Sequence, residues 1–542
     1  MKNALNFGFI PHSIEMEDYY QQQVIWQDQP IWKLITSIAE RLPEKIAICG
    51  KQGTMSYREL VQQADEYASG FISQGLMCDD RVILQISNRI EFISLLLGLF
   101  RAGIVPVLTL PAHGYKEIYH FIQVSGAKAF ISDQEVVAEQ LEHYQALKNN
   151  DPWSSICKIY SFSSNTNQCD LFPHKEITGF TPPQINPANP ALFLVSGGTT
   201  GLPKLIPRTH NDYNYNIACA SKACELTEAD TYLTVLPAGH NFPLGCPGML
   251  GILANGGTVL MSQDPSPDEC FELIEQYKVT VTALVPALSQ LWTKALEWED
   301  VDLSSLRLIQ VGGAKLCESD ALAMQRGFPN KLQQVFGMAE GLICCTRIGD
   351  AIEVITQTQG RPISLLDEIK IVDNKGVQVL QGEDGELLTR GPYTLRGYYR
   401  AQQHNQRSFS KDGFYCSGDK VKIDENGNII VTGRIKDVVN RGGETIVCDE
   451  VEGYLLSHPD ILHVAVIGIP DPDMGELVAA AIVTSSQSLS LIELKAFLLA
   501  QGIAKFKLPE RLQVMSDLPL TAVGKIDKKI LANMPISNWK QN

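Results

Sequence analysis

The segment from Leu194 to Arg208, LVSGGTTGLPKLIPR, holds the densest set of residues that could bind an anion. An apolar run ends in small residues whose backbone N–H groups can approach a phosphate and whose hydroxyls can donate to its oxygens. These residues are Ser196, Gly197, Gly198, Thr199, Thr200 and Gly201, with Lys204 as a nearby point charge. A Walker loop needs a second glycine directly before the lysine, and Pro203 stands there instead. The segment predicts a phosphate-binding loop, although an ordinary glycine-rich turn has the same composition.

Four further segments are dense in small and polar residues, and they follow the loop in order along the chain. They are 236–248 (LPAGHNFPLGCPG), 336–341 (FGMAEG), 415–419 (YCSGD) and 433–444 (GRIKDVVNRGGE). Each has an ordinary explanation when taken alone: His240 fits a core histidine, Glu340 a carboxylate at a helix start, and Asp419 a turn residue. Their occurrence together in this order favours a shared site.

The elements that must position these residues follow from hydrophobic periodicity, which predicts an α/β chain. A helical pattern at 56–73 and a strand pattern at 81–86 typify the first block. A strand at 191–195 leads into the anion-binding loop and opens a second block, with further strands at 231–236, 279–285 and 306–311.

Short strands with hairpin signals begin near residue 368, at Asp384-Gly385 and Asn426-Gly427 among others. A mixed α and β segment of roughly 100 residues, about the size of one domain, closes the chain. The predicted divisions are an N-terminal α/β subdomain, a second α/β subdomain, a β-rich subdomain and a C-terminal domain: 1–190, 191–367, 368–435 and 436–542.

Charge and composition exclude several classes of protein. The chain has 542 residues, of which 61 are acidic and 45 basic, so the formal net charge is −16. A nucleic-acid coat needs a cationic surface, which this balance does not supply. Thirteen cysteines are an odd number and form no C-x-x-C pair, which predicts buried free thiols in a reducing cytoplasm.

The most membrane-like stretch is 92–112, FISLLLGLFRAGIVPVLTLPA. Arg101 lies at its centre, and a central arginine is costly in lipid, so the stretch predicts a buried helix and not a membrane span. Ala102-Gly103 closes this helix, and a short strand follows. The N-terminus has no sustained apolar run and no small-residue cleavage site, so no secretory signal is expected.

The ordered motifs resemble those of the adenylate-forming superfamily, which includes acyl-CoA ligases, luciferases and the adenylation domains of nonribosomal peptide synthesis. The match runs from Leu96-Leu97-Gly98 through the five segments above to 520–525, LTAVGK, and so covers nearly the whole chain. The segments HNFPLGCPG, VFGMAEG and RGPYTLRGYY are most similar to the stand-alone aryl-acid adenylating enzymes of siderophore synthesis. Those enzymes are the 2,3-dihydroxybenzoate–AMP and salicylate–AMP ligases.

The resemblance implies a large N-terminal portion of two α/β subdomains with a barrel-like β-rich subdomain, and a small mobile α+β C-terminal domain. It also implies attack of a carboxylate on the α-phosphorus of ATP, release of pyrophosphate, and transfer of the acyl group to a thiol. The C-terminal domain rotates between the two steps, about a hinge that falls here at Lys436 or its neighbour Asp437.

Residue roles carry over by the same resemblance. Lys525 bridges the carboxylate and the α-phosphate, Glu340 helps to hold Mg²⁺, and His240 lies near the carboxylate. The loop with Lys204 binds the β- and γ-phosphates, while Asp419 and Arg434 bind the ribose. The adenine slot and the adjoining ATP contacts fall to Gly313, Ala314, Val335, Phe336, Gly337, Met338 and Ala339. Without the resemblance, Lys525 would be taken for a solvated surface lysine.

The substrate pocket is expected around Asn241, because relatives that activate amino acids carry an aspartate there to pair with the ammonium. A neutral amide leaves a buried ammonium unpaired, so Asn241 favours an acid without an α-amine. The expected lining of a flat aromatic slot is Asn241, Phe242, Cys246, Gly198, Gly337 and Ile343. Cys246 stands where dihydroxybenzoate enzymes commonly carry serine, a difference worth about 1 kcal/mol that leaves salicylate and 2,3-dihydroxybenzoate both open.

The acceptor implied by the resemblance is the phosphopantetheine thiol of a separate aryl carrier protein, because no carrier motif stands out in this chain. ATP and Mg²⁺ are the expected cofactors, and neither nucleic acid nor a membrane is an expected partner. Two alternatives stay open: an aryl- or acyl-CoA ligase that uses free coenzyme A, and an inert nucleotide-binding regulator on the same fold.

Overall fold

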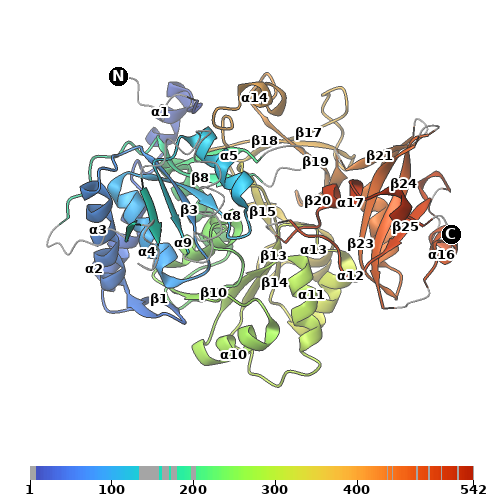
Figure 1. Ribbon diagram of the computed structural model, residues 1–542, viewed down its shortest axis with the longest axis horizontal. Helices are drawn as coiled ribbons and strands as arrows, with labels where there is room; N and C mark the ends of the chain where they lie inside the picture. Colours follow the sequence, from blue (N-terminus) through green and yellow to red (C-terminus); the bar gives the residue numbers. More distant parts are fainter. Residues whose placement is uncertain are drawn as a thin grey trace.

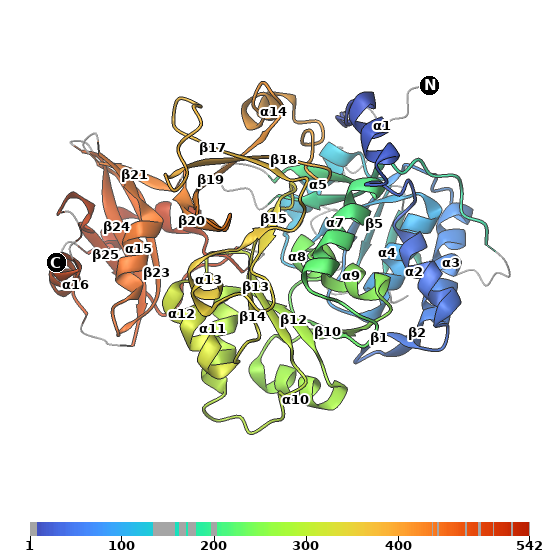
Figure 2. The same ribbon diagram turned by 180° about the vertical axis from the view of Figure 1, so that it is seen from behind.

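The computed structural model describes residues 8–133, 158–161, 170–171, 180–196, 203–435, 437–441, 444–471, 474–485, 489–501, 503, 505–521 and 524–540. A large N-terminal body carries two α/β sheets and a β-rich sheet, and a smaller C-terminal body lies at one end of the molecule (Figure 1). The view from behind shows the N-terminal helix on the large body and the C-terminus on the small one (Figure 2).

The first sheet is parallel except at one edge, where β8 and β9 form an antiparallel hairpin. Its strand order is β7 (Asp170–Leu171), β6 (Lys158–Ser161), β5 (Ala129–Ser132), β3 (Arg81–Gln85), β4 (Val105–Thr109), β8 (Pro190–Val195) and β9 (Leu205–Thr209). The helices of this part are α1 (Ile14–Gln22), α2 (Trp32–Arg41), α3 (Tyr57–Ser73), α4 (Ile90–Ala102), α5 (Tyr115–Ser125) and α7 (His210–Ala223).

The second sheet is parallel through its centre and antiparallel at both edges. Its order is β16 (Arg361–Pro362), β15 (Ile343–Cys345), β14 (Leu332–Gly337), β13 (Leu308–Gly312), β12 (Val281–Leu284), β10 (Thr231–Thr234), β11 (Thr258–Met261), β1 (Ile46–Gly50) and β2 (Gly53–Ser56). Its helices are α8 (Asn241–Gly245), α9 (Gly248–Ala254), α10 (Pro267–Tyr277), α11 (Pro286–Ala295), α12 (Glu318–Gly327) and α13 (Ile352–Gln357).

The sheets exchange strands across the division expected at residue 190. β1 and β2 come from the N-terminal block but lie in the second sheet, where β1 pairs with β11. Conversely, β8 was expected to open the second block, and it pairs with β4 in the first sheet. The strand expected at 191–195 is confirmed, whereas its assignment to the second block is wrong. Periodicity specifies a strand but not its partner.

Helix α4 explains why the membrane-like stretch is so apolar. It contacts β4 of the first sheet and both β1 and β2 of the second, so every residue in it except Glu91 is buried. Gly103 ends the helix in the left-handed conformation, at φ +72°, and β4 follows. The expected buried helix and strand are confirmed, and no helix in the described ranges is long and apolar enough to cross a membrane.

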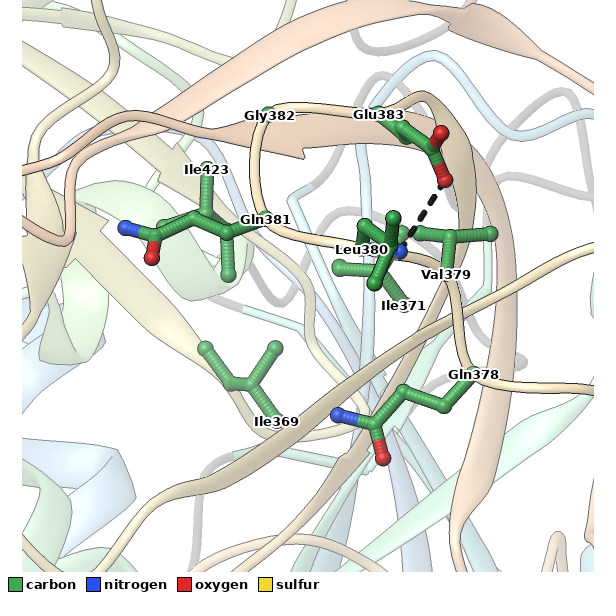
Figure 3. A pocket seen from close by; sticks show the side chains of 9 residues that line it. All are labelled: Ile369, Ile371, Gln378, Val379, Leu380, Gln381, Gly382, Glu383 and Ile423. Carbon is green, nitrogen blue, oxygen red and sulfur yellow. Dashed lines mark hydrogen bonds between the residues drawn. The ribbon is translucent and has the colours of Figure 1, made fainter.

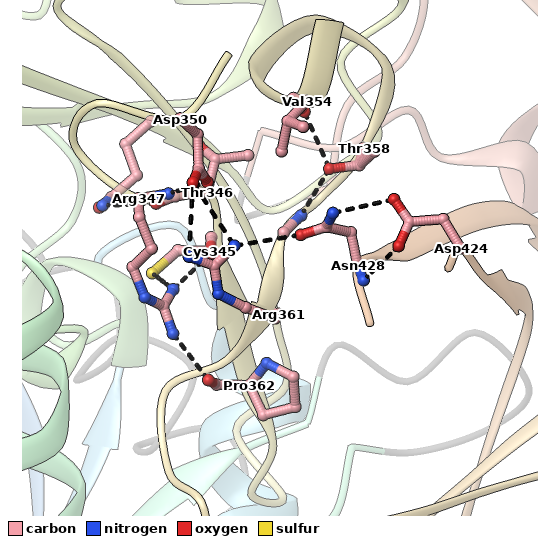
Figure 4. A network of polar contacts seen from close by, with 12 residues as sticks. Cys345, Thr346, Arg347, Asp350, Val354, Thr358, Arg361, Pro362, Asp424 and Asn428 are labelled. Carbon is pink, nitrogen blue, oxygen red and sulfur yellow. Dashed lines mark hydrogen bonds and ion pairs between the residues drawn. The ribbon is translucent and has the colours of Figure 1, made fainter. Parts of the chain in front are cut away.

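The β-rich sheet is an antiparallel meander that contains both expected hairpins. Its strands are β17 (Glu368–Val372), β18 (Gly385–Arg390), β19 (Tyr415–Ile423) and β20 (Ile429–Arg434), with α14 (Gln402–Ser408) before β19. A polar network fastens this sheet to the edge of the second sheet (Figure 4). There the Arg361 guanidinium lies 3.4 Å from Asp350 Oδ1 and donates to Asn428 Oδ1 over 3.4 Å. Asn428 in turn donates to Asp424 over 2.8 Å.

A groove at the β-rich sheet lies beneath the segment 378–383 (Figure 3). Ile369, Ile371 and Ile423 form its apolar floor. None of the residues predicted to bind ATP or substrate lines it, so this groove is separate from the predicted site.

The C-terminal body is a sheet with helices on it. The strand order is β22 (Glu444–Val447), β21 (Val438–Arg441), β24 (Gly475–Thr484) and β23 (Ile461–Asp471), and β25 (Arg511–Val514) pairs with β24. Its helices are α15 (Cys448–Leu456), α16 (Leu491–Ala500), α17 (Lys528–Ala532) and two 3₁₀ turns, η2 (Lys505–Lys507) and η3 (Ile536–Asn538). Helix α15 contacts both β23 and β20, so it joins the two bodies.

Eleven cysteines lie in the described ranges, and all carry free thiols. Most are buried as expected, but Cys78 is exposed, and Cys219, Cys317 and Cys416 are half-buried. The expectation of uniformly buried thiols is therefore wrong for these four positions.

Replacing Gly98 by alanine should destabilise the large body. A Cβ at Gly98 would lie 2.8 Å from Cβ of Tyr67 and 3.0 Å from the Ala64 carbonyl oxygen, because α3 and α4 pack closely there. We expect the free energy of unfolding to fall by about 1–3 kcal/mol, measured by scanning calorimetry. The control is Gly453→Ala in α15, where a Cβ meets nothing within 4 Å and stability should rise by about 0.4–1 kcal/mol. Equal effects of the two substitutions would contradict the packing argument.

Candidate functional site

Several motif residues lie at one edge of the second sheet. Strands β10, β12, β13 and β14 run parallel, so their carboxyl ends share that edge. His240 follows β10, Gly313 follows β13, and Glu340 follows β14. Ligands of open α/β sheets bind beside the carboxyl ends of the strands.

The predicted phosphate loop is the turn of the β8–β9 hairpin. The backbone N–H of Ser196 donates to the Lys204 carbonyl over 2.9 Å, and the Lys204 N–H donates to Ser196 Oγ over 2.9 Å. These bonds close the base of the loop. Gly197, Gly198, Thr199, Thr200 and Gly201 lie outside the described residues.

Tyr398 links the loop to Glu340. The Lys204 ammonium lies 5.8 Å from the centre of the Tyr398 ring, and the Tyr398 hydroxyl donates to Glu340 Oε1 over 2.7 Å. The same hydroxyl lies 2.9 Å from the Tyr415 hydroxyl. Burial and the adjacent Glu340 raise the pKa of Tyr398, so it stays a neutral donor. Sequence reasoning missed Tyr398 as a site residue, although it lies in the segment RGPYTLRGYY.

Asp419 and Arg434 face each other on β19 and β20, where they are partners in the antiparallel register. Arg434 Nε lies 2.8 Å from Asp419 Oδ1, and the Asp419 side chain is only 8% exposed. The nearby carboxylate raises the pKa of Arg434, so the arginine stays charged. This pair was predicted to act together.

Lys525 extends from the C-terminal body toward these residues. A Cβ placed on Gly313 would lie 4.0 Å from Lys525 Cε. Burial and the charge of Arg434 lower the pKa of Lys525 to about 8, while Asp419 and Glu340 oppose that shift. Gly313 and Lys525 are 212 positions apart in the chain, yet they lie in one electrostatic environment.

The loop that carries Lys525 is held by its own backbone. The Thr521 N–H donates to the Lys525 carbonyl over 2.6 Å, and the Lys525 N–H donates to Thr521 Oγ1 over 3.2 Å. Gly524 adopts φ +75° in this turn, a conformation that favours glycine.

His240 is neutral at physiological pH. Burial, followed by the charge of Lys525, lowers the pKa of His240 to about 4. Its Nδ1 accepts the Phe242 N–H over 3.2 Å at the start of α8, which leaves the ring proton on Nε2. The imidazole therefore offers one N–H donor.

Asn241 has an internal partner for each end of its amide. The Tyr213 hydroxyl donates to Asn241 Oδ1 over 2.8 Å, and Asn241 Nδ2 donates to Cys246 Sγ over 3.3 Å. Burial raises the pKa of Cys246 to about 12, so its thiol is uncharged. The Arg208 guanidinium stacks 4.8 Å from the centre of the Tyr213 ring. Sequence reasoning missed Tyr213, because nothing in its spacing links it to Asn241.

The other expected pocket residues lie against the ends of β13 and β14. A Cβ on Gly312 would lie 3.2 Å from Phe242 Cζ, and one on Gly337 would lie 3.3 Å from Ile343 Cγ1. The Ile343 N–H donates to the Tyr393 hydroxyl over 3.2 Å, which itself donates to Asp367 over 2.6 Å. Tyr393 and Asp367 thus support the strand that carries Ile343.

Two further predictions stay untested by the geometry. Lys436, the predicted hinge, lies outside the described residues. No cluster of three or more His, Cys, Asp or Glu side chains suited to a metal ion occurs in the described ranges. Glu340 was predicted to act with phosphate oxygens, so it needs no such cluster.

Comparisons with known proteins cover nearly the whole chain. The family model described as AMP-binding enzyme matches residues 35–399, and the model of the AMP-binding enzyme C-terminal domain matches residues 450–525. The vibriobactin-specific 2,3-dihydroxybenzoate-AMP ligase of Vibrio cholerae is 45% identical over 96% of this chain and 97% of its own length. The salicyl-AMP ligase / salicyl-S-ArCP synthetase of Mycobacterium tuberculosis is 43% identical over 97% of this chain and 94% of its own length. The apo structure of MbtA from Mycobacterium smegmatis has a TM-score of 0.76 and 42% identity, covering 98% of this chain and all of that one.

The Lys525 ammonium should titrate near pH 8, well below an ordinary lysine. Asp419 raises this pKa, so Asp419→Asn should lower it further. The measurement is an NMR titration of ¹³C-lysine-labelled protein, with the signal assigned by its loss in Lys525→Arg. Asp424→Asn, in the turn between β19 and β20, is the control and should leave the value unchanged. A pKa of Lys525 near 10.5 in the wild-type protein would contradict the buried position of its ammonium beside Arg434.

Proposed function

This chain belongs to the AMP-binding enzyme family of adenylate-forming enzymes, and on that premise we propose that it activates an aryl acid as its adenylate and transfers the aryl group to a carrier-protein thiol. The observation that carries the proposal is the position of Lys525, whose Cε lies 4.0 Å from where a Cβ on Gly313 would be, at the end of β13, and whose pKa is shifted by Arg434, Asp419 and Glu340. The relatives named above act on 2,3-dihydroxybenzoate and salicylate, by their names, and extend over nearly the whole chain.

The first half-reaction brings two anions together. A carboxylate oxygen forms a bond to the α-phosphorus of ATP, and the bond from that phosphorus to pyrophosphate breaks, with no net proton transfer. The site must therefore supply positive charge where negative charge accumulates. Lys525 is charged at neutral pH, because its pKa is about 8, and it can contact both anions. Lys204 is placed at the base of the phosphate loop.

The nucleotide fits the Asp419–Arg434 pair and the ends of β13 and β14. Arg434 fixes one oxygen of Asp419, and the carboxylate keeps lone pairs for the two ribose hydroxyls. We assign the adenine slot to Gly313, Ala314, Val335 and Phe336, where small residues leave space for a flat ring. Gly337, Met338 and Ala339 continue this wall toward Glu340.

Glu340 suits Mg²⁺ by its chemistry. One of its oxygens accepts the Tyr398 hydroxyl, and the other has no hydrogen-bond partner among the described residues. A carboxylate oxygen is a ligand that Mg²⁺ prefers, so Glu340 would hold the ion together with phosphate oxygens of the nucleotide and water. Bound Mg²⁺ supplies charge neutralisation to the phosphates, while Tyr398 holds the Glu340 side chain in place.

The pocket suits an aryl acid without an α-amine. His240 can donate its Nε2–H to the substrate carboxylate, since its other ring nitrogen is occupied. Asn241 offers a neutral amide where an ammonium would need a carboxylate. Phe242, Cys246 and Ile343 make the rest of the wall apolar, as a benzene ring requires. Both 2,3-dihydroxybenzoate and salicylate fit this description.

In the second half-reaction the carrier thiol loses its proton, and its sulfur forms a bond to the acyl carbon as the bond to AMP breaks. Lys525 occupies the adenylation site in the described arrangement, so a thiol needs the C-terminal body to move. We place the hinge at Lys436. The family resemblance sets the whole reaction within siderophore biosynthesis.

ATP–pyrophosphate exchange tests the substrate class. Exchange with salicylate or 2,3-dihydroxybenzoate should exceed exchange with amino acids by at least about 10²-fold, because an unpaired buried charge costs about 3–5 kcal/mol. Benzoate serves as the control that lacks hydroxyls. Comparable exchange with an amino acid would contradict the assignment of Asn241. Faster transfer to free coenzyme A than to a carrier protein would favour the CoA-ligase alternative.

Replacing Lys436 by proline tests the hinge, because proline fixes φ and restricts rotation there. Adenylation should stay within a few-fold of wild type, while thiol transfer should fall by at least about tenfold. Rapid-quench measurement of each half-reaction separates the two, and Lys436→Ala is the control that keeps backbone freedom. An equal loss in both half-reactions would place the hinge elsewhere.

A further inference from the structure

An ion cluster connects the junction of the two bodies to the loop that carries Lys525. The Lys528 ammonium lies 2.5 Å from Asp437 Oδ2 and 2.7 Å from Glu452 Oε1. Asp437 follows β20 at the junction, Glu452 lies on α15, and Lys528 opens α17, three residues after Lys525. The three side chains are 26%, 16% and 25% exposed, so the cluster is largely withdrawn from water.

The backbone extends this connection into the large body. The Asp437 N–H donates to the Arg434 carbonyl over 3.1 Å, and the Cys448 N–H donates to the Asp437 carbonyl over 3.1 Å. Asp437 is thereby tied both to the end of β20 and to the start of α15. Arg434, Asp437 and Lys528 thus form a continuous path of contacts from the Asp419 pair to the Lys525 loop.

Glu452 fixes the far side of the cluster. Its Oε1 also accepts the N–H of Val466 in β23 over 2.6 Å, so the carboxylate cannot follow Lys528 freely. The Asp527 side chain accepts the N–H groups of Lys529 and Ile530 over 3.0 and 3.3 Å, which orients the first turn of α17. Lys528 is therefore held by anchors on two elements of the C-terminal body.

Lys528 is the charge that balances this group of carboxylates. Burial raises the pKa of Glu452 to about 7 and also raises the pKa of Asp449, and Lys528 lowers both. Lys315 and Arg434 face Asp449 from the large body. Conversely, Glu452 and Asp437 raise the pKa of Lys528, so it stays charged. Loss of this one ammonium would leave Asp437 and Glu452 without their cation.

We propose that Lys528 is a positioning residue for adenylation: by bridging Asp437 and Glu452 it holds the Lys525 loop at a fixed place relative to the junction. Rotation at the junction then carries Lys525 into and out of the site as part of one rigid body. Lys528 touches neither substrate nor nucleotide in this account, and it acts through Lys525. The proposal rests on the adenylation function proposed above.

The matched control is the ion pair of Lys507 with Glu450, on the same helix α15. Lys507 Nζ lies 2.6 and 2.7 Å from the two Glu450 oxygens, and its side chain is 21% exposed. This pair also joins a lysine to α15, but it involves neither Asp437 nor the Lys525 loop. Lys507→Met therefore removes a similar ion pair on α15 that does not link the junction to the Lys525 loop.

The first readout needs no substrate. In the ¹³C-lysine titration, Lys525 should shift from near pH 8 toward the ordinary value of 10.5 in Lys528→Met, because it leaves the surroundings of Arg434. Lys507→Met should keep the wild-type pKa of Lys525. Lys528→Arg, which retains the charge and both carboxylate contacts, should keep the pKa of Lys525 close to the wild-type value. An unchanged Lys525 pKa in Lys528→Met would overturn the proposal, whatever the substrate of the enzyme.

The second readout is the rate of each half-reaction. Lys528→Met should lower adenylation by at least about tenfold, since a misplacement of about 1 Å can cost about 10²-fold. Transfer from preformed aryl-adenylate should stay within about threefold, because that step does not use Lys525. Equal loss of both half-reactions together with a lowered melting temperature would show a merely structural role and overturn the proposal. Failure of the wild-type protein to activate aryl acids would instead count against the proposed function, and the titration would still decide the role of Lys528.

Discussion

The adenylation site depends on one electrostatic constraint: a lysine ammonium must be held beside an arginine, partly out of water, until two anions bind. Burial and Arg434 both disfavour the charged form of Lys525, and Asp419 and Glu340 oppose them. When a carboxylate and a phosphate bind, their negative charges stabilise the charged form of such a lysine. Burial, followed by the charge of Lys525, likewise lowers the pKa of His240 and keeps its ring neutral.

The fold meets this constraint by bringing residues of the second sheet, the β-rich sheet and the C-terminal body to one place. The ends of β10, β13 and β14 supply His240, Gly313 and Glu340, and the β-rich sheet adds Asp419 and Arg434. The C-terminal body contributes Lys525, from a short loop that its own backbone closes. In the proposed mechanism, movement of the C-terminal body removes this charge from the site without disturbing the nucleotide contacts proposed for Asp419 and Arg434.

The sequence predicted element types well and strand partners poorly. Periodicity and glycine signals located α3, α4, β3 and both hairpins, because these depend on local pattern. The pairing of β1 with β11 and of β8 with β4 depends on contacts between distant segments, which periodicity does not encode. For the same reason Tyr213, Tyr398 and Lys528 were missed: each contacts residues that are distant in the chain, and its spacing carries no signal. The motif residues were found because their order in the chain resembles a family pattern, and the glycine loop and Lys436 stay predictions.

The most direct test of this account is the single-turnover rate of each half-reaction in Lys525→Ala, followed by rapid quench with the aryl acid that the wild-type enzyme activates best. If Lys525 stabilises charge only during adenylation, formation of the aryl-adenylate should fall by about 10²–10³-fold. Transfer of a preformed aryl-adenylate to the carrier thiol should then stay within a few-fold of wild type. Adenylation at the wild-type rate, or an equal loss in both steps, would contradict the account.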